Sequence, residues 1–201
     1  IKVLIRDKEG NETTKKFSFD VDGTDQNKPK INVYPAEDGA YLGEHVSLNL
    51  KADNRKCVNS ASTEIELGKG ISDYTVEYAD GFEEAKAPVY NKTDNSVQIF
   101  VKKKADADVS GEGNLATVKV GVPTDLTKDK KFTYAVTAGN FEYTDEQGEN
   151  HELSFTRKTQ RMEVKSAYNI SVENTVAGED TKIIVTDKNG KTVKGIGIYM
   201  A

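Results

Sequence analysis

Apolar and polar residues alternate along much of the chain, most clearly in residues 113–123, GNLATVKVGVP. Ala or Val occupies positions 116, 118, 120 and 122, and a Thr and a Lys lie between them. This period of two is typical of a strand with one face in a core and the other in water. Pro123 cannot donate a ladder hydrogen bond, so the strand should end there. We predict that this segment is a central strand, with the other strands paired to it or packed across from it.

The same alternation recurs in short segments that are separated by turn residues. The segments expected to form strands are residues 31–34, 46–50, 63–67, 74–78, 88–90, 97–101, 132–136, 141–143, 153–155 and 162–164. Segment 88–90 is a candidate edge strand because it contains Pro88. No stretch of a dozen residues keeps the apolar spacing of a helix, so the pattern predicts an all-β antiparallel sandwich or barrel. The predicted core comprises Val46, Leu48, Ile65, Val76, Ile99, Val118, Val120 and Tyr134.

Hairpin patterns flank this region on both sides. Residues 1–20 predict a hairpin that turns at residues 7–11. The segment DKEGNETTKKFSFDVDGT, residues 7–24, resembles the last two strands and exit linker of bacterial Ig-like repeats. Near the other end, Asn189 and Gly190 form a strong hairpin signal between residues 183–186 and 193–198. The turn sequences DKEG and DKNG are similar. They fit either Ig-like modules on both flanks or two chain ends that complete one small sheet.

We therefore expect three parts. Residues 1–29 would be the end of an Ig-like module and a linker, residues 30–166 a β-sandwich, and residues 167–201 the start of a further Ig-like module. Strand patterns reach both ends of the sequence, so we expect a piece of a longer polypeptide. The composition, which is poor in cysteine and rich in Lys, Asp, Asn and Thr, is typical of a secreted or cell-surface bacterial module.

Charge and composition narrow the possible partners. The net charge is −5, and the 28 Lys and Arg residues are scattered, whereas nucleic-acid binding needs a basic stripe. No apolar run approaches the roughly 20 residues of a membrane span. We therefore expect neither nucleic-acid binding nor membrane insertion. Cys57 is the single cysteine, so no internal disulfide can form, and we expect it to be a small buried residue.

Catalytic and metal-binding motifs are not evident. His45 and His151 are far apart in sequence, and no G-x-S-x-G, H-E-x-x-H or phosphate-binding glycine loop occurs. We expect no enzyme activity, no catalytic residue, no cofactor and no metal. Two acidic segments leave calcium open as an alternative to a solvated loop or linker. They are residues 106–111, DADVSG, and the junction that contains Asp20, Asp22 and Asp25.

Sugar-binding sites favour flat aromatic side chains, and the chain contains no Trp. Most Tyr and Phe residues are in phase with core positions. Phe100 is an exception because it lies between Ile99 and Val101, in phase with Gln98 and Lys102. It is a bulge residue, a contact to a second sheet, or an exposed anchor for a partner.

Residues 31–164 resemble a cohesin, the receptor module of cellulosomal scaffolds. The similar segments are AYLGEHVSLNLKA, STEIELGKG, YTVEYADG, SVQIFVKKKA, GEGNLATVKVGVP and NFEYTDEQGENHEL. The resemblance implies a nine-stranded jelly-roll β-sandwich without enzyme activity. It also implies a dockerin-type protein partner, a calcium-loaded helical module, which binds one sheet face made by the third, fifth, sixth and eighth strands.

The resemblance also implies a set of outward, partner-binding residues. They are Glu64, Glu66, Tyr90, Gln98, Phe100, Lys102, Thr117 and Lys119. We expect the strand of Phe100 to lie beside residues 113–123, so that Phe100 shares a face with Thr117 and Lys119. The alternatives are a carbohydrate-binding jelly-roll module and a passive structural spacer in a surface enzyme or adhesin. If the module binds a dockerin, we expect contact with polysaccharide only through other parts of the longer protein to which it belongs.

Overall fold

The computed structural model describes residues 2–6, 12–16, 28–68, 71, 73–124, 126, 131–173 and 180–195, the first two ranges by their backbone alone. Strands dominate these residues, and none of them lies in an α-helix. The predicted all-β fold class is confirmed. In the described residues, no helix is long and apolar enough to cross a membrane.

One layer is a four-stranded antiparallel sheet with the order β3-β5-β10-β7. Its strands are β3 (Ile31–Pro35), β5 (His45–Ala52), β10 (Gly113–Gly121) and β7 (Tyr74–Tyr78). Strand β10 is an inner strand, as the alternation in residues 113–123 predicts. A bulge between Asn114 and Ala116 interrupts its pairing with β5, and Leu115 and Ala116 are both buried.

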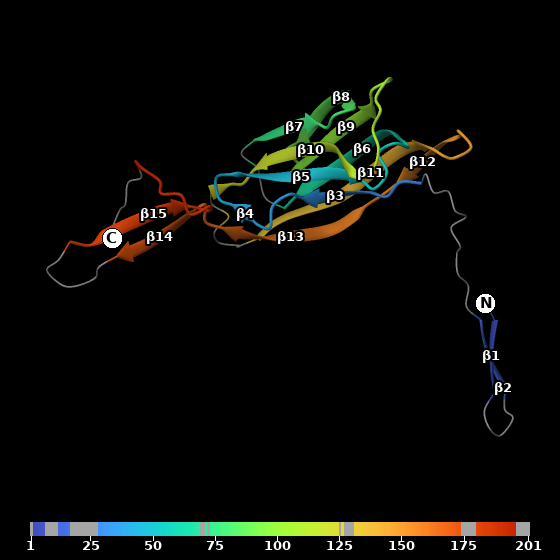
Figure 1. Cartoon of the computed structure of the whole chain (residues 1–201), viewed down its shortest axis with the longest axis horizontal. Coiled ribbons are helices and arrows are strands. Elements are labelled where there is room, and N and C mark those ends of the chain that lie inside the picture. The colour runs from blue at the N-terminus through green and yellow to red at the C-terminus, as the bar shows by residue number, and fades with distance from the viewer. Residues whose placement is uncertain are drawn as a thin grey trace.

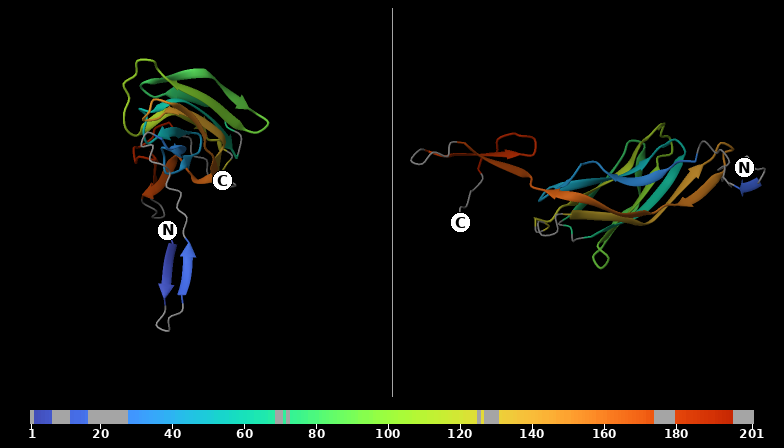
Figure 2. Two further views of the ribbon diagram at one scale, coloured as in Figure 1. Left: turned by 90° about the vertical axis from the view of Figure 1, so that its right-hand side faces the viewer. Right: turned by 90° about the horizontal axis from the view of Figure 1, so that it is seen from below.

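The other layer is a seven-stranded sheet with the order β4-β13-β11-β6-β9-β8, in which β12 also pairs with β11. Its strands are β4 (Ala40–Tyr41), β13 (Arg157–Lys165), β11 (Lys131–Thr144), β6 (Val58–Leu67), β9 (Ser96–Lys103), β8 (Phe82–Asn91) and β12 (Asn150–Ser154). All pairs are antiparallel except β4–β13. The two layers form a sandwich (Figures 1 and 2). Each segment expected to form a strand overlaps one of these strands, with residues 132–136 and 141–143 both in β11, and the two-residue strand β4 was not expected.

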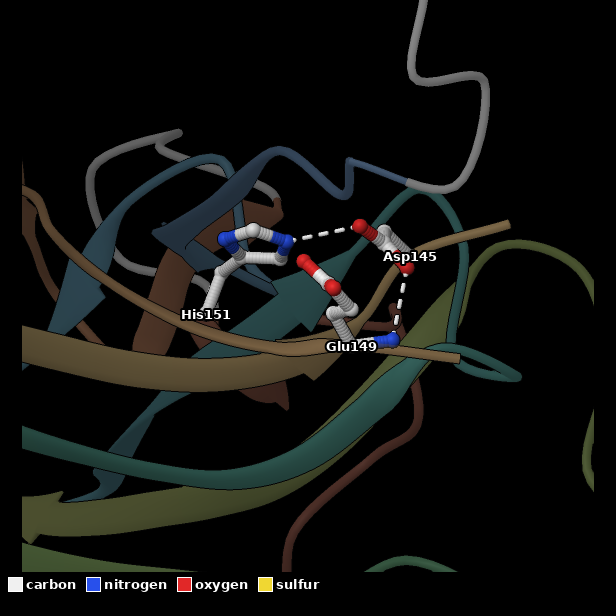
Figure 3. A group of neighbouring side chains, drawn as sticks. All are labelled: Asp145, Glu149 and His151. Carbon is white, nitrogen blue, oxygen red and sulfur yellow. Dashed lines mark hydrogen bonds and ion pairs between the residues drawn. The ribbon is translucent and has the colours of Figure 1, made fainter. Parts of the chain in front are cut away.

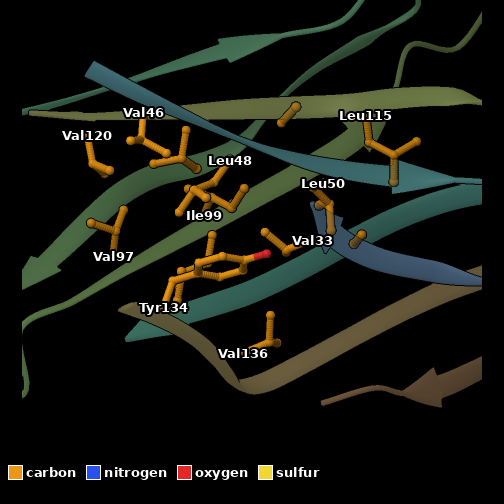
Figure 4. Packing of buried hydrophobic residues seen from close by; sticks show 14 of the residues in the cluster. Val33, Val46, Leu48, Leu50, Val97, Ile99, Leu115, Val120, Tyr134 and Val136 are labelled. Carbon is orange, nitrogen blue, oxygen red and sulfur yellow. The ribbon is translucent and has the colours of Figure 1, made fainter. Parts of the chain in front are cut away.

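The core lies between the two sheets (Figure 4). The predicted core residues are confirmed: seven of the eight are at most 2% exposed, and the eighth, Val76, is half-buried and packs against them. Burial of a large apolar side chain contributes roughly 1.5–3 kcal/mol to folding, so this interface holds the sandwich together. Cys57 is also buried, as expected, and the Asn54 amide donates to its Sγ at 3.2 Å.

Two separate two-stranded sheets flank the sandwich (Figure 1). Strand β1 (Lys2–Arg6) pairs with β2 (Glu12–Lys16), which confirms the predicted first hairpin. Its turn, Phe17, Phe19 and the Asp20–Asp25 junction lie outside the described residues. At the other end, β14 (Tyr168–Glu173) pairs with β15 (Lys182–Asp187).

The predicted turn at Asn189 and Gly190 is present after β15. The Gly190 amide donates to the Asp187 carbonyl at 3.0 Å, and the Val193 amide donates to the Val185 carbonyl at 2.9 Å. Residues 196–198, expected in the returning strand, lie outside the described residues. The division of the chain into three domains stays a prediction.

Candidate protein-binding face

The side of the seven-stranded sheet that points away from the core is formed by four neighbouring, hydrogen-bonded strands. We call this surface, built by β11, β6, β9 and β8, the outer face. Its cross-strand rows are Glu142–Ser60–Lys102–Glu83, Asn140–Ser62–Phe100–Lys86, Ala138–Glu64–Gln98–Val89 and Ala135–Glu66–Ser96–Asn91. Alternate residues of paired strands line one surface, so these side chains form a continuous patch.

Phe100 is a central aromatic residue of the outer face. It is half-buried, and the Lys86 ammonium lies 4.9 Å from the centre of its ring. Phe100 also lines a shallow pocket of about 200 Å³ together with Ser62, Asn140 and Glu142. Its pairing with β6 is regular, whereas register shifts occur on β8 on either side of Lys86. Phe100 is therefore an outward residue and not a bulge of its own strand.

Charges of both signs surround Phe100. The Lys102 ammonium lies 3.2 Å from a Glu83 carboxylate oxygen, and the Ser96 hydroxyl donates to Glu64 at 2.7 Å. Glu66 is exposed and forms no ion pair with another described residue. A half-buried aromatic group amid mixed charges combines the elements of a protein-binding surface.

Thr117 and Lys119 lie on the opposite side of the sandwich, and the prediction that they share a face with Phe100 is wrong. Both belong to β10, which pairs with β5 and β7, whereas β9 pairs with β6 and β8. The Thr117 hydroxyl donates to Asn49, and Lys119 forms an ion pair with Glu77 at 2.5 Å. The period of two identifies inward and outward residues, but it does not assign a strand to one of two sheets.

The expected outward orientation of Tyr90 is also wrong. Tyr90 pairs with Val97, a fully buried residue, and its own side chain packs against the core. Its hydroxyl donates to the Asn95 side chain at 2.7 Å, and its ring centre lies 5.9 Å from that of Tyr74. The register shifts on the two sides of Lys86 together add two residues to β8, so the phase of the strand is unchanged beyond them. Val89 is therefore on the outer face, and Tyr90, the next residue, faces inward.

A polar cluster that the sequence reasoning missed occupies the turn between β11 and β12 (Figure 3). The Asp145 carboxylate accepts from the amides of Gln147 at 2.9 Å and Glu149 at 2.8 Å, and it lies 2.7 Å from His151 Nε2. The hydrogen bond to His151 is the main reason that the pKa of Asp145 is lowered. The sequence DEQGENH, residues 145–151, contains Asp145, Glu149 and His151 at close spacing and could have predicted this cluster.

Carboxylates and imidazoles are metal-ligand types, and single ligand atoms of Asp145, Glu149 and His151 lie within 4.8 Å of one another. However, hydrogen bonds inside the turn already engage both Asp145 oxygens. We therefore assign the cluster to turn stabilisation. In the described part of the chain, the exposed loop that contains Asp106 and Asp108 forms no such three-ligand group.

The sequence matches no family model and no curated protein. Among solved structures, the chain is similar to the cohesin module of a Clostridium perfringens family 33 glycoside hydrolase, with 15% identity over 69% of this chain and 96% of that one and a TM-score of 0.47. It is also similar to a type I cohesin–dockerin complex of Clostridium thermocellum, with 14% identity, coverages of 67% and 99%, and a TM-score of 0.46. A type I cohesin from Pseudobacteroides cellulosolvens gives 14% identity, coverages of 68% and 92%, and a TM-score of 0.45.

Proposed function

We propose that this chain is a non-catalytic, cohesin-like module that binds a dockerin-type protein through the outer face. The observation that carries the proposal is the continuous surface of the paired strands β11, β6, β9 and β8 with Phe100 inside it. These four strands correspond to the sheet face that the sequence resemblance implies. Of the residues expected from the resemblance, Glu64, Glu66, Gln98, Phe100 and Lys102 lie on this surface.

The chemistry of the outer face suggests how the partner is held. Phe100 is already half-buried, so burial of its remaining surface on docking contributes about 1–1.5 kcal/mol. The neighbouring Val89, which is 45% exposed, adds apolar area. The charges of Glu64, Glu66 and Lys102 act mainly on the association rate and on the choice of partner. The resemblance further supports a secreted or cell-surface bacterial setting.

Calorimetric titration with a panel of purified, calcium-loaded dockerin modules of both types tests the proposal. We expect wild-type protein to bind at least one of them, and Phe100→Ala to weaken that binding by about tenfold, since about 1.4 kcal/mol corresponds to tenfold. Thr117→Ala is the matched control on the other sheet and should bind like the wild type. Absence of binding to every dockerin, or equal affinities for Phe100→Ala and wild type, would contradict the proposal.

A further inference from the structure

The four-stranded sheet, on the side of the sandwich opposite the outer face, contains a second and larger pocket. It extends across β3, β5 and β10 and has a volume of about 540 Å³. This volume lies within the range of about 300–1,000 Å³ that is typical of small-molecule sites. Residues that line it include Tyr34, Asn49, Lys51, Asp53, Glu112 and Asn114. None of them belongs to the outer face.

Tyr34 supplies an aromatic surface at this pocket. Its side chain is 44% exposed, although large aromatic groups are usually more deeply buried. The Arg157 guanidinium lies 4.6 Å from the ring centre and supports the ring from one side. Within the described residues, the Tyr34 hydroxyl makes no hydrogen bond. The ring therefore offers an apolar face and a free polar end to a ligand.

Two carboxamides lie beside Tyr34 in the same pocket. The Oδ1 atom of Asn49 accepts from the Thr117 hydroxyl at 2.8 Å, which leaves the amide nitrogen of Asn49 to donate elsewhere. Asn114 is half-buried and makes no side-chain hydrogen bond to a described residue, so it can both donate and accept. Paired donors and acceptors next to an aromatic ring suit a ligand that is rich in hydroxyl groups.

The charged groups of the pocket compensate one another. Lys51 forms an ion pair with Glu112 at 2.5 Å, and Asp53 accepts from the backbone amide of Lys30 at 2.7 Å. The two lysines and two carboxylates that line the pocket sum to zero charge. This balance favours an uncharged ligand over an anionic or cationic one.

We propose that this pocket is a binding site for neutral polysaccharide. A pyranose ring stacks on Tyr34, and its hydroxyl groups contact Asn49 and Asn114. The site is independent of the proposed docking site because it lies on the other sheet. The module would then hold a protein on one face and a sugar chain on the other.

Affinity gel electrophoresis tests this site with three neutral polysaccharides, hydroxyethylcellulose, xyloglucan and galactomannan, and with anionic polygalacturonate for comparison. We expect at least one neutral polysaccharide to retard the wild-type protein. Tyr34→Ala should lower the association constant by about tenfold, and Asn114→Ala should also weaken it. Tyr34→Phe, which keeps the ring, should retain most of the binding.

Phe100→Ala serves as the matched control, because it changes the outer face and should leave the retardation unchanged. Conversely, Tyr34→Ala should bind dockerin like the wild type, so failure of one site is distinguishable from failure of the other. The polysaccharide site is overturned if no neutral polysaccharide retards the wild type, or if only polygalacturonate does. Equal retardation of the wild type, Tyr34→Ala and Asn114→Ala would overturn it as well.

Discussion

At the scale of single residues, Ile99 and Phe100 are chain neighbours in opposite environments. Ile99 is fully buried between the sheets, whereas Phe100 is half-buried on the outer face beneath the Lys86 ammonium. A strand turns successive side chains to opposite sides. Substitution of Ile99 should therefore affect the stability of the fold, and substitution of Phe100 should affect binding.

Truncation of Phe100 should therefore leave the fold nearly intact. We expect Phe100→Ala to shift Tm only slightly, while Ile99→Ala costs about 2–5 kcal/mol because it leaves a cavity in the core. Thermal melts of wild type and both variants measure this difference. A destabilisation by Phe100→Ala as large as that by Ile99→Ala would remove Phe100 from the proposed site.

Asp145 makes the stability of the hairpin turn depend on pH. Its pKa is lowered, chiefly by the hydrogen bond with His151, so the folded state binds the proton less tightly than the unfolded state. The resulting stabilisation is present above the ordinary pKa and is lost as the pH falls through the lowered one. Urea unfolding between about pH 5 and about pH 2 should show a smaller loss of stability for Asp145→Asn than for wild type. Glu146→Gln, in the same turn, should follow the wild type; a loss in Asp145→Asn equal to that of the wild type would contradict the assignment.

At the scale of elements, the alternation in the sequence suffices to place most strands and the core. It places Val118 and Val120 correctly because one buried and one solvated face impose the period of two. Sheet membership depends instead on long-range pairing, so the alternation cannot show that Thr117 and Lys119 lie on a different sheet from Phe100. For Tyr90 the local pattern is ambiguous because Val89 and Tyr90 are adjacent apolar residues, and only the pairing of β8 with β9 shows that Val89 faces outward and Tyr90 inward.

The hairpin of β11 and β12 contains a pair of like charges. Glu142 and Glu152 are directly opposite each other, and both are exposed. Like charges in opposed positions destabilise a strand pair, whereas opposite charges stabilise it by roughly 0.2–1 kcal/mol. Glu152→Lys should therefore raise the free energy of unfolding by about this amount at low salt.

Glu146→Lys makes the same change of net charge in the exposed turn and is the control for Glu152→Lys. Chemical unfolding at low and high salt compares the two variants. If both variants raised the free energy of unfolding equally, the increase would come from the change in net charge and not from the cross-strand pair.

At the scale of the whole molecule, the C-terminal hairpin is attached to the sandwich by ionic and aromatic contacts. Lys188, just after β15, forms an ion pair with Glu44, and its ammonium lies 4.5 Å from the centre of the Tyr41 ring. Within the sandwich, Lys165 forms an ion pair with Asp38 at 2.9 Å, and its ammonium lies 5.8 Å from the centre of the Tyr41 ring. Such contacts orient a module more than they stabilise it, because exposed ion pairs contribute about 0–1 kcal/mol.

Lys188→Ala should free the hairpin without unfolding the sandwich. We expect the Tm of the sandwich to stay nearly constant, while ¹⁵N relaxation reports faster motion of β14 and β15. Lys191→Ala, a neighbouring exposed lysine, is the control. Unchanged relaxation in Lys188→Ala would show that other contacts orient the hairpin.

The proposal that the outer face binds a dockerin is tested most directly by NMR mapping. ¹⁵N-labelled protein is titrated with an unlabelled dockerin that binds it in calorimetry, and amide shifts are followed along each strand. We predict that the largest shifts occur in β6, β8, β9 and β11, around Ser62, Gln98 and Phe100, while β5 and β10 change little. Largest shifts in β5 and β10, around Asn49 and Thr117, would place the partner on the opposite sheet and contradict the proposal.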